Sequence, residues 1–523
     1  MSRRLFKSTA TVSAMTTLSR MLGLVRDMVF ARYVGAAGST DAFFIAFKIP
    51  NFFRRLFAEG AFSQAFVPVL TEYRTQRSEE EVRSLIQNVA GTLGGFLFLL
   101  TVFVALAAPV VAGLFGMGLL MKASSETYDL LTQMLRITFP YLLFISLVAL
   151  AGSILNVYGR FAVAAFTPVF LNVVLIGVAI WVSPHFEKPV VALAWGVFLA
   201  GGVQLLFQFP FLKRLGILLW PRWGWHDEGV RRIGKLMLPA ILGSSVVQIN
   251  LLFDTVIASF LVSGSVSWLY YSDRLVEFPL GVFGIALATV ILPSLSQKHA
   301  AANPEDFSRT LDWALRWVLL IGAPAMVGLM VLAGPILVTL FYYGKFDIQD
   351  VDMSRLSLMA YSLGLLGFIG VKVLAPGYYA RQDTKTPVKI GIKAMLTNMV
   401  LNVAFVVPLV LLGVQGPHSG LALATSSSAF LNAGMLYRGL RRDGVLHNHP
   451  GWLMLFIRVI VASGAMAGLL IWGAGNLTEW MQWGLWQRAE HLVLWVVAGC
   501  GVYFVMLLLM GVKVKELVGK GSL

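Results

Sequence analysis

The chain has 523 residues, of which 58% are hydrophobic and only 13% are charged. Soluble domains are typically about 45–50% apolar and about 25% charged, so this composition excludes an ordinary soluble protein and indicates an integral membrane protein. The net charge of +15 does not indicate a nucleic-acid partner, because Lys and Arg stand between hydrophobic runs and no basic patch with interleaved aromatic residues is present.

Apolar stretches of roughly 20 residues predict helices that cross a membrane, rather than the shorter strands of a barrel. In chain order the predicted spans are 10–34, 40–71, 88–115, 128–156, 163–183, 189–212, 232–262, 266–297, 311–340, 354–380, 386–413, 418–439, 452–475 and 489–512. The first two spans are the weakest by hydropathy because they carry several charges. The expected fold class is an all-α integral membrane protein with about 14 transmembrane helices.

The basic start of the sequence is not followed by a short apolar core with a small-residue cleavage site, so we expect an uncleaved first helix. At the other end the single cysteine, Cys500, lies inside the last apolar run. A disulfide within the chain and a cysteine-based metal site are therefore excluded, and we expect no cofactor.

Positive charge alternates between the loops in a way that predicts the orientation of the spans. Loops on one side carry Arg74, Arg77, Arg83, Arg160, Lys213, Arg214, Arg222, Arg231, Arg232, Lys235, Lys298, Arg309, Arg381, Lys385, Lys389, Arg438, Arg441 and Arg442. The opposite loops, such as 35–39, 263–267 and 413–419, are poor in cations. Because cytoplasmic loops carry the excess of Lys and Arg, both termini are expected in the cytoplasm.

A weak internal repeat predicts two related halves. The motif at 158–160 resembles that at 379–381, and 68–70 resembles 293–295, at nearly equal offsets. Each half would begin in the cytoplasm, so the two would be related by an axis along the membrane normal. The predicted division is an N-terminal lobe at 1–220 (spans one to six), a C-terminal lobe at 221–445 (spans seven to twelve) and two extra spans at 446–523.

Charged side chains inside the spans are the strongest functional signal. Span one contains Arg20 and Arg26, and on an ideal helix Arg20, Gly23 and Asp27 share a face. A charge in a span costs roughly 2.5–3.5 kcal/mol on insertion scales, so it is retained where it faces water or a ligand. The alternative is that Arg26 and Asp27 are interfacial and reach outward to the headgroups.

Span two carries charges along one face of an ideal helix, namely Asp41, Lys48, Arg55 and Glu59. Pro50 removes a backbone hydrogen bond and can kink the helix, which leaves open whether Arg54 or Arg55 points inward. The alternative is a structural stripe of ion pairs.

Span eight contains Asp273, Arg274 and Glu277, and Arg274 can pair locally with Glu277 three residues away. Span eight occupies the place in the second half that span two occupies in the first. Charges at corresponding places predict a central, water-filled cavity at the repeat interface that binds an anion, although a self-satisfied local pair is the alternative.

Polar residues in spans seven and eleven have two possible roles, a cation site or hydrogen bonds between helices. Asp254 in span seven, with Asn398 and Asn402 in span eleven, could ligate a hard cation, but interhelical hydrogen bonds are slightly favoured.

The glycine pairs Gly91/Gly95 and Gly464/Gly468 predict close packing between helices.

At these residues the sequence resembles the MurJ (MviN) family of bacterial lipid II flippases, in segments that read SRMLGLVRD, TDAFFIAFKIPNFFRRLFAEGAFSQAFVPVL, SWLYYSDRLVEFPLGVFGIALATVILPSLS and VKVLAPGYYARQDTKTPVK. The resemblance implies a fold of the multidrug/oligosaccharidyl-lipid/polysaccharide exporter superfamily. That fold has two six-helix lobes with a V-shaped central cavity, and two extra helices that line a groove for the lipid tail.

The resemblance also assigns residues. The family's cavity arginines match Arg20, Arg26, Arg54 and Arg274, and its acids match Asp41 and Glu277, with Glu59 and Asp273 nearby. Asp254, Asn398 and Asn402 resemble part of a sodium site found in some members, but a complete ligand set is not evident.

The resulting hypothesis is a flippase that moves lipid II from the cytoplasmic to the periplasmic leaflet of the bacterial inner membrane by alternating access. The arginines would hold the diphosphate through charge-assisted bonds. The membrane potential would bias the cycle, and whether a monovalent cation is also coupled to it stays open. The implied partners are lipid II (an undecaprenyl-diphosphate-linked disaccharide pentapeptide), membrane lipids and, as a candidate, the cell-wall synthesis machinery.

Three alternatives remain open at the level of sequence. The chain could export another polyprenyl-linked oligosaccharide or drugs within the same superfamily. It could be a membrane glycosyltransferase, although no glycine-rich phosphate loop, metal-ligand spacing or nucleophile–base pair is present, so we expect no enzyme. It could be a scaffold that transports nothing, which the charged spans disfavour.

Overall fold

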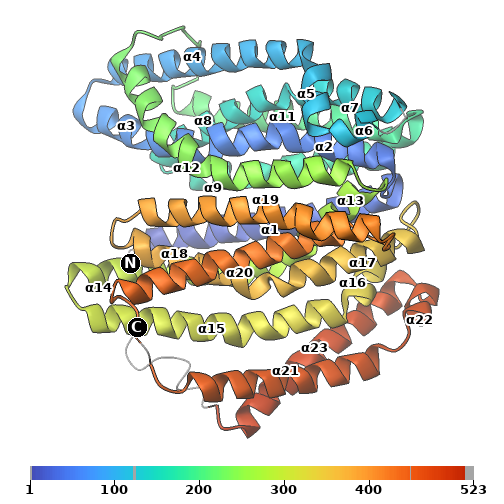
Figure 1. The fold of residues 1–523 in the computed structure, drawn as a ribbon. Helices are drawn as coiled ribbons and strands as arrows, with labels where there is room; N and C mark the ends of the chain where they lie inside the picture. Colours follow the sequence, from blue (N-terminus) through green and yellow to red (C-terminus); the bar gives the residue numbers. More distant parts are fainter. Residues whose placement is uncertain (1–2, 122–124, 219, 448, 513–523) are drawn as a thin grey trace. The chain divides into compact units, whose positions relative to one another are not determined.

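The computed structural model describes residues 3–121, 125–218, 220–447 and 449–512, apart from the side chains of 3–10, 57–60, 125, 240, 242–244, 246–247 and 285. Every regular element in these ranges is a helix (Figure 1). The chain divides into two compact units, Met1–Ser267 and Trp268–Leu523.

The first unit contains long helices together with several short ones. Its elements are α1 (Arg3–Val34), α2 (Gly38–Phe53), the π-helix η1 (Arg54–Phe62), α3 (Ser63–Gln76), α4 (Glu79–Leu106), α5 (Ala108–Phe115), α6 (Met117–Met121), α7 (Ser125–Thr138), α8 (Tyr141–Val157), α9 (Phe161–Phe166), α10 (Pro168–Gly177), the π-helix η2 (Val178–Val182), the short 3₁₀ helix η3 (Ser183–His185), α11 (Pro189–Arg214) and α12 (Glu228–Ser259).

The second unit begins within α13 and is also helical. Its elements are α13 (Ser265–Pro279), the π-helix η4 (Leu280–Gly284), α14 (Ile285–Ala300), α15 (Pro304–Val331), α16 (Ala333–Phe341), α17 (Ile348–Leu363), α18 (Leu365–Tyr379), α19 (Lys385–Leu411), α20 (Ser419–Arg442), α21 (Trp452–Ala474), α22 (Leu477–Gln482) and α23 (Leu485–Leu509).

Ten helical segments of the described chain are long and apolar enough to cross a membrane. They are Glu79–Leu106, Glu126–Val157, Phe161–His185, Pro189–Arg214, Ser265–Ala300, Pro304–Val331, Ile348–Tyr379, Lys385–Leu411, Trp452–Ala474 and Leu485–Leu509. Each overlaps one predicted span, so an all-helical membrane protein is confirmed. The spans predicted at 10–34, 40–71, 232–262 and 418–439 coincide with the helices α1, α2 to α3, α12 and α20, and their crossing of the membrane stays a prediction.

Local sequence fixes where key helices begin. Ser78 accepts a hydrogen bond from the Glu81 N–H at 3.3 Å, while the Glu81 carboxylate accepts one from the Ser78 N–H at 3.1 Å. This reciprocal capping box starts α4. Asp227 caps α12 in a similar way, accepting from the Val230 N–H at 3.1 Å, and it also accepts from Asn88 on α4 at 3.1 Å.

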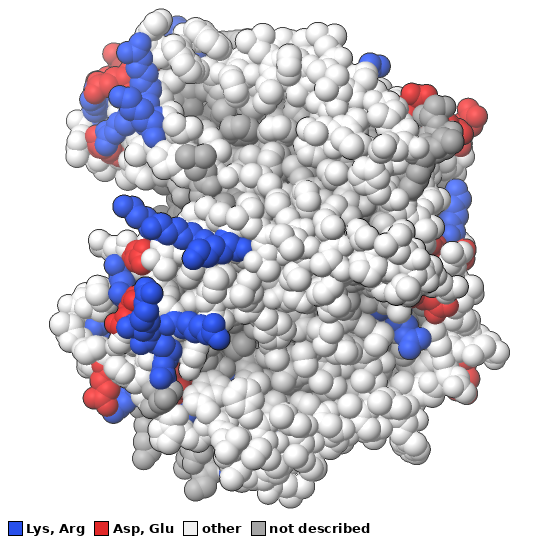
Figure 2. All heavy atoms as spheres, viewed as in Figure 1, with Lys and Arg blue, Asp and Glu red and all other residues white. Residues whose placement is uncertain are grey.

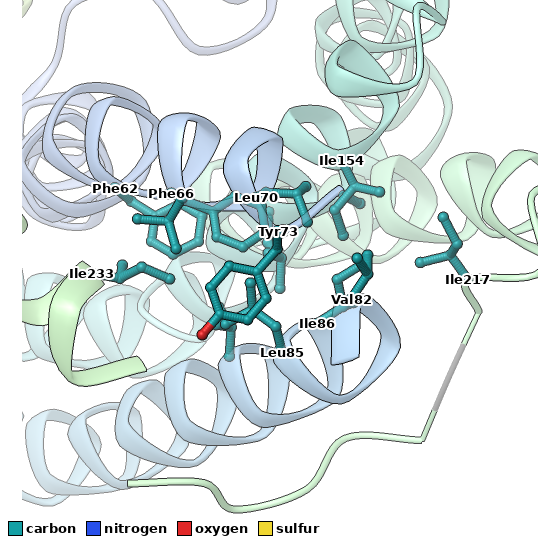
Figure 3. Close-up of a cluster of buried hydrophobic side chains, with 14 of the residues drawn as sticks. Phe62, Phe66, Leu70, Tyr73, Val82, Leu85, Ile86, Ile154, Ile217 and Ile233 are labelled. Atoms are coloured by element: carbon teal, nitrogen blue, oxygen red, sulfur yellow. The ribbon is translucent and has the colours of Figure 1, made fainter. Parts of the chain in front are cut away.

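An apolar core holds the loop-rich end of the first unit together (Figure 3). Phe62, Phe66 and Leu70 come from η1 and α3, Leu85 and Ile86 from α4, and all are buried. At the rim, the two Arg232 Nη atoms each donate to Glu72 at 2.8 Å, which joins α12 to α3. Bidentate geometry of this kind fixes the relative orientation of two helices.

In the second unit, α21 and α23 pack on each other and on α15 (Figure 1). The Tyr503 hydroxyl donates to the Leu320 carbonyl at 2.8 Å. Arg488 is buried, and its guanidinium donates to the carbonyls of Trp480, Met481, Val338 and Tyr342. A cation with four backbone acceptors satisfies the ends of α16 and α22, where carbonyls lack partners within the helix.

Charge lies at the ends of the helices in each unit rather than along their flanks (Figure 2). In the first unit blue and red spheres lie over the ends of α3, α4 and α12, and the flanks of the helices are white (Figures 1 and 2). In the second unit they gather near α14, the start of α19 and the end of α20 (Figures 1 and 2). Apolar flanks with charged ends are what a lipid-embedded helix bundle requires.

The glycine pairs Gly91/Gly95 and Gly464/Gly468 do not form the close contacts between helices that their spacing predicts. A Cβ at Gly91 would lie 2.1 Å from the Arg222 carbonyl oxygen, and one at Gly95 would lie 2.6 Å from the Trp223 ring, so this pair packs against a loop rather than a helix. A Cβ at Gly464 or Gly468 would meet nothing within 4 Å. Their prediction as helix-packing positions is therefore wrong, because spacing alone does not say which face of a helix is covered.

Candidate functional site

Arg26 is buried on α1 within a polar cluster. Its Nε and Nη2 donate to Asp27 Oδ1 at 3.0 and 2.7 Å, and its Nη1 donates to Asn172 Oδ1 on α10 at 3.1 Å. Arg26 is 5% exposed and Asp27 is 1% exposed. The alternative that these two side chains reach outward to the headgroups is therefore wrong.

Asn172 holds this cluster together and was not among the predicted residues. Its Nδ2 donates to the Ser19 carbonyl on α1 at 3.0 Å, while its oxygen accepts from Arg26. A Cβ added at Gly23 would lie 3.9 Å from the Asn172 amide, so the small residue keeps α1 and α10 close. A single amide in an otherwise apolar span is a signal for an interhelical hydrogen bond, and it could have identified Asn172.

Arg20 differs from Arg26 in its surroundings. Arg20 is exposed on α1, six positions before Arg26 along the same helix. The structure thus provides one fixed guanidinium and one exposed guanidinium on this helix. An exposed arginine is free to approach a phosphate with its planar fork, which matches two phosphate oxygens.

Asp41, near the start of α2, accepts hydrogen bonds from the N-terminus of α13. Its Oδ2 accepts from the Gly264 N–H at 2.7 Å, and its Oδ1 accepts from the Ser267 N–H at 2.8 Å and the Ser267 hydroxyl at 2.6 Å. Asp41 is 3% exposed. A carboxylate at a helix N-terminus satisfies backbone donors and complements the helix dipole, so Asp41 ties α2 to the start of α13.

Helix α2 changes its winding after Pro50. Because Pro50 has no N–H, the Ala46 carbonyl loses its partner within the helix, and the Thr138 hydroxyl donates to that carbonyl at 3.1 Å instead. Four residues beyond Pro50 the backbone becomes the π-helix η1. Arg54, Arg55 and Glu59 all lie in η1, and π-helical turns are frequent at functional sites.

The charges of span two are placed as follows. Lys48 Nζ donates to Thr255 on α12 at 3.1 Å. Arg54 Nε donates to Asn51 at 3.0 Å, and both Arg54 and Arg55 are half-buried. The side chain of Glu59 lies outside the described residues. The structure therefore keeps both arginines as candidates, and the projection onto an ideal helix no longer applies beyond Arg54.

The charges of span eight lie on α13, directly before the π-helix η4. Arg274 Nη1 donates to Glu277 at 2.8 Å, and its guanidinium lies 5.0 Å from the centre of the Tyr270 ring. The side chains of Arg274 and Glu277 are 33% and 46% exposed, and Asp273 beside them is half-buried. This is the local pair expected from their spacing, and its exposure leaves it open to exchange with another charged group.

The predicted cation ligands lie in different units. Asp254 is half-buried on α12 of the first unit, whereas Asn398 and Asn402 are fully buried on α19 of the second. Within the described residues no three His, Cys, Asp or Glu side chains form a group that could hold a metal. The cation site stays a prediction.

Comparisons with known proteins place the chain in a family. The family model described as "Lipid II flippase MurJ" matches residues 30–488. The "Probable lipid II flippase MurJ" of Vibrio cholerae serotype O1 is 53% identical over 521 residues, covering 99% of this chain and 98% of the relative. The "Lipid II flippase MurJ" of Burkholderia cenocepacia is 42% identical over 515 residues, covering 97% and 98%.

Solved structures agree with this fold. A structure described as "Lipid II flippase MurJ, inward closed conformation" superposes with a TM-score of 0.78 at 28% identity, covering 95% of this chain and 97% of the other. An inward-facing MATE family transporter of the MOP superfamily gives a TM-score of 0.67 at 16% identity, covering 83% and 98%, which shows the fold alone.

The helical fold, with charged residues on its membrane helices, defines a multi-pass membrane transporter of the MurJ/MATE type rather than an enzyme. Within that class, the chain belongs to the MurJ lipid II flippase family. The family that the sequence resembles is thereby confirmed. The individual roles of the charged residues stay predictions.

Proposed function

We propose that this chain flips lipid II from the cytoplasmic to the periplasmic leaflet of the bacterial inner membrane by alternating access. Lipid II is the substrate after which the family and its relatives are named. Its sugar and diphosphate cannot cross hydrocarbon unaided, because charged groups in the bilayer core are costly. A transporter must therefore shield the headgroup while the polyprenyl tail stays in lipid.

The observation that supports this proposal is the guanidinium of Arg26, which is held in place on α1, a helix that is predicted to cross the membrane. Its acceptors Asp27 and Asn172 orient it before any substrate arrives. A pre-oriented cation loses little conformational entropy when it binds, which favours affinity. Arg20, Arg54, Arg55 and Arg274 would complete a cationic cavity for the diphosphate, with Glu59, Asp273 and Glu277 as exchangeable partners.

Two acids would act differently in this cycle. Glu277 would release Arg274 when the diphosphate binds, because the exposed pair is weak. Asp41 would instead hold the α12–α13 turn against α2 in one conformational state, and these hydrogen bonds would break in the other state. Moving charge through the membrane potential is worth about 2.3 kcal/mol per unit charge per 100 mV, enough to bias such a cycle.

The wider architecture of the proposal is that of the family fold. Fourteen spans would form two six-helix lobes, 1–220 and 221–445, with both termini cytoplasmic. The segment 446–523 would supply a groove for the tail along α21 and α23. Both helices pack on α15 through one side and leave large apolar side chains such as Leu453, Ile460 and Leu508 exposed, as a lipid-facing pair would.

The test is translocation of fluorescent lipid II in vesicles that contain the purified protein. Arg20→Ala, Arg26→Ala and Arg274→Ala should each slow translocation strongly. Arg309→Ala should not, because Arg309 is an exposed cation near the start of α15 that pairs with Glu305. Translocation by all three variants at the rate of the unmodified chain would overturn the proposal. Preferential export of another polyprenyl-linked oligosaccharide or of a drug would favour the alternative substrates.

A further inference from the structure

The segment between α11 and α12 packs along α4 (Figures 1 and 3). We call residues 220–227 the tryptophan loop. The Arg222 N–H donates to the Gln87 carbonyl at 3.0 Å, and the Gly224 N–H donates to the Thr92 hydroxyl at 3.0 Å. Asn88 and Asp227 join the end of the loop to the same helix at 3.1 Å. The loop therefore has a fixed position on α4.

The surface of α4 is shaped to receive this loop. Gly91 lies under the backbone of Arg222 and Gly95 lies under the ring of Trp223, where any side chain would collide. Gly94, on another face of the same helix, has only ordinary contact with Leu147 at 3.8 Å. The fit is thus specific to the face that carries the loop.

The loop places Trp223 beside Gly95, where α4 turns from polar to apolar residues, and exposes two further tryptophans. Trp220, Trp223 and Trp225 are 88%, 61% and 57% exposed. Gln87 and Asn88, beside the loop, are polar, whereas Phe96, Phe98 and Leu99 just beyond it are exposed and apolar. Tryptophan favours the membrane–water interface, where its ring contacts acyl chains and its N–H contacts water.

Basic residues accompany these rings. Lys213, Arg214 and Arg222 are exposed, and none of them takes part in an ion pair within the part of the chain that the structure describes. Arg232 nearby differs, because Glu72 holds it through two hydrogen bonds. The three unpaired cations have the charge that an anionic lipid surface attracts.

We propose that the tryptophan loop is a membrane anchor that binds anionic phospholipid headgroups at the leaflet where α4 begins. The rings of Trp220, Trp223 and Trp225 enter the headgroup–acyl boundary, and Lys213, Arg214 and Arg222 hold the lipid phosphates. The backbone hydrogen bonds of Arg222 and Gly224 allow this depth, since unpaired backbone groups are excluded from hydrocarbon. The anchor uses none of the arginines assigned to substrate transport.

The depth of the loop is measured by spin labelling of the full chain in phosphatidylglycerol/phosphatidylethanolamine bilayers. Cys500→Ala removes the only cysteine, and Trp220→Cys then carries the nitroxide. The label should collide more with lipid-dissolved oxygen, and less with a water-soluble nickel complex, than a label on Ala301→Cys in the exposed α14–α15 turn. Gly91→Ala should shift the label toward water, whereas Gly94→Ala should not. Equal accessibility at positions 220 and 301 would overturn the anchor.

Lipid selectivity is measured by native mass spectrometry of the purified chain titrated with phosphatidylglycerol. The variant Lys213→Gln/Arg214→Gln/Arg222→Gln should lower affinity about five-fold per neutralised cation. Its matched control is Lys385→Gln/Lys389→Gln/Arg438→Gln, which removes three exposed cations elsewhere. An equal loss in both variants, or no loss in the first, would overturn the proposal. The translocation assay, run on the same variants, keeps this outcome separate from that of the transport site.

Discussion

The side-chain amide of Asn172 orients the guanidinium of Arg26. Arg26 has five N–H donors, and the cluster gives it acceptors on α1 and α10. Because Asp27 is its neighbour in sequence, Asp27 alone would move with α1 and could not hold Arg26 relative to a second helix. Asn172 supplies that second point of attachment, and its own amide is fixed by the Ser19 carbonyl.

We therefore expect Asn172→Leu to weaken lipid II binding. The variant removes an acceptor from a charged donor, and hydrogen bonds to charged groups contribute about 1.5–3 kcal/mol, or roughly 10–100-fold in affinity. The measurement is lipid II affinity in nanodiscs, with Asn156→Leu on the exposed face of α8 as the control. Unchanged affinity in Asn172→Leu would show that Arg26 is oriented by other contacts.

Asp41 is the residue whose role the structure changes most. The sequence placed it on the charged face of span two, whereas the described contacts are three donors at the start of α13. The signal was absent from the sequence, because no spacing rule connects a residue on span two with a turn more than two hundred positions later.

Asp41→Asn should destabilise the closed α12–α13 turn, because an amide cannot accept all three hydrogen bonds. Leaving buried donors unsatisfied costs about 1–3 kcal/mol. Ser267→Ala removes the hydroxyl donor only and should have a smaller effect. Hydrogen exchange of the Gly264 and Ser267 amides measures the opening, and equal protection in the Asp41→Asn variant and the unmodified chain would contradict the role given to Asp41.

At the scale of elements, π-helical winding recurs next to the charged residues. Pro50 precedes η1 in the first unit, and Pro279 directly precedes η4 in the second. The sequence located both spans and predicted that Pro50 can kink the helix, but it did not predict the π-helical winding that follows. The sequence also could not identify Thr138, a residue of another helix that donates to the Ala46 carbonyl in place of the missing Pro50 N–H.

The role of Thr138 gives a prediction about the proline. Thr138→Val should destabilise the first unit by about 1–3 kcal/mol, because the Ala46 carbonyl is then buried without a donor. Pro50→Ala should reverse most of this loss by restoring an N–H within the helix, which makes the two changes non-additive. Thermal unfolding in detergent measures both variants singly and together.

Thr132 provides the control on the same helix. It is also buried, and its hydroxyl makes no hydrogen bond among the described contacts. Thr132→Val should therefore be neutral or stabilising. A loss for Thr132→Val equal to that for Thr138→Val would mean that both substitutions act through packing rather than through the Ala46 carbonyl.

At the scale of the whole molecule, the sequence identified an all-helical membrane protein. It did not identify most of the tertiary contacts of the charged residues and glycines. Hydropathy located every helix that is apolar enough to span, because twenty consecutive apolar residues have few other uses. Hydropathy could not give the partners of Asp41 and Gly91, or Asn172 as a partner of Arg26, since these residues are brought near by tertiary packing. Glycine spacing suggested a helix as the partner of Gly91, and the partner is a loop.

Acid should weaken the joint between α3 and α12. The Arg232 guanidinium, through its hydrogen bonds, lowers the pKa of Glu72 below its ordinary value of 4.5. A group whose folded pKa is lowered stabilises the fold above its unfolded pKa and loses that contribution as the pH falls through the folded value. We expect thermal stability to decline below about pH 4.5 in the unmodified chain, and the Glu72→Gln variant to lose less. Parallel profiles for the two proteins would assign the acid sensitivity to other carboxyl groups.

The glycines under the tryptophan loop have a consequence for association between molecules. Two glycines four residues apart on an apolar helix form the surface that membrane helices use to dimerise. Here the chain covers that surface with its own backbone, so neighbouring proteins in a crowded bilayer meet tryptophan and arginine instead. Deletion of residues 220–225 would expose the Gly91/Gly95 surface of α4. The resulting protein should dimerise through α4.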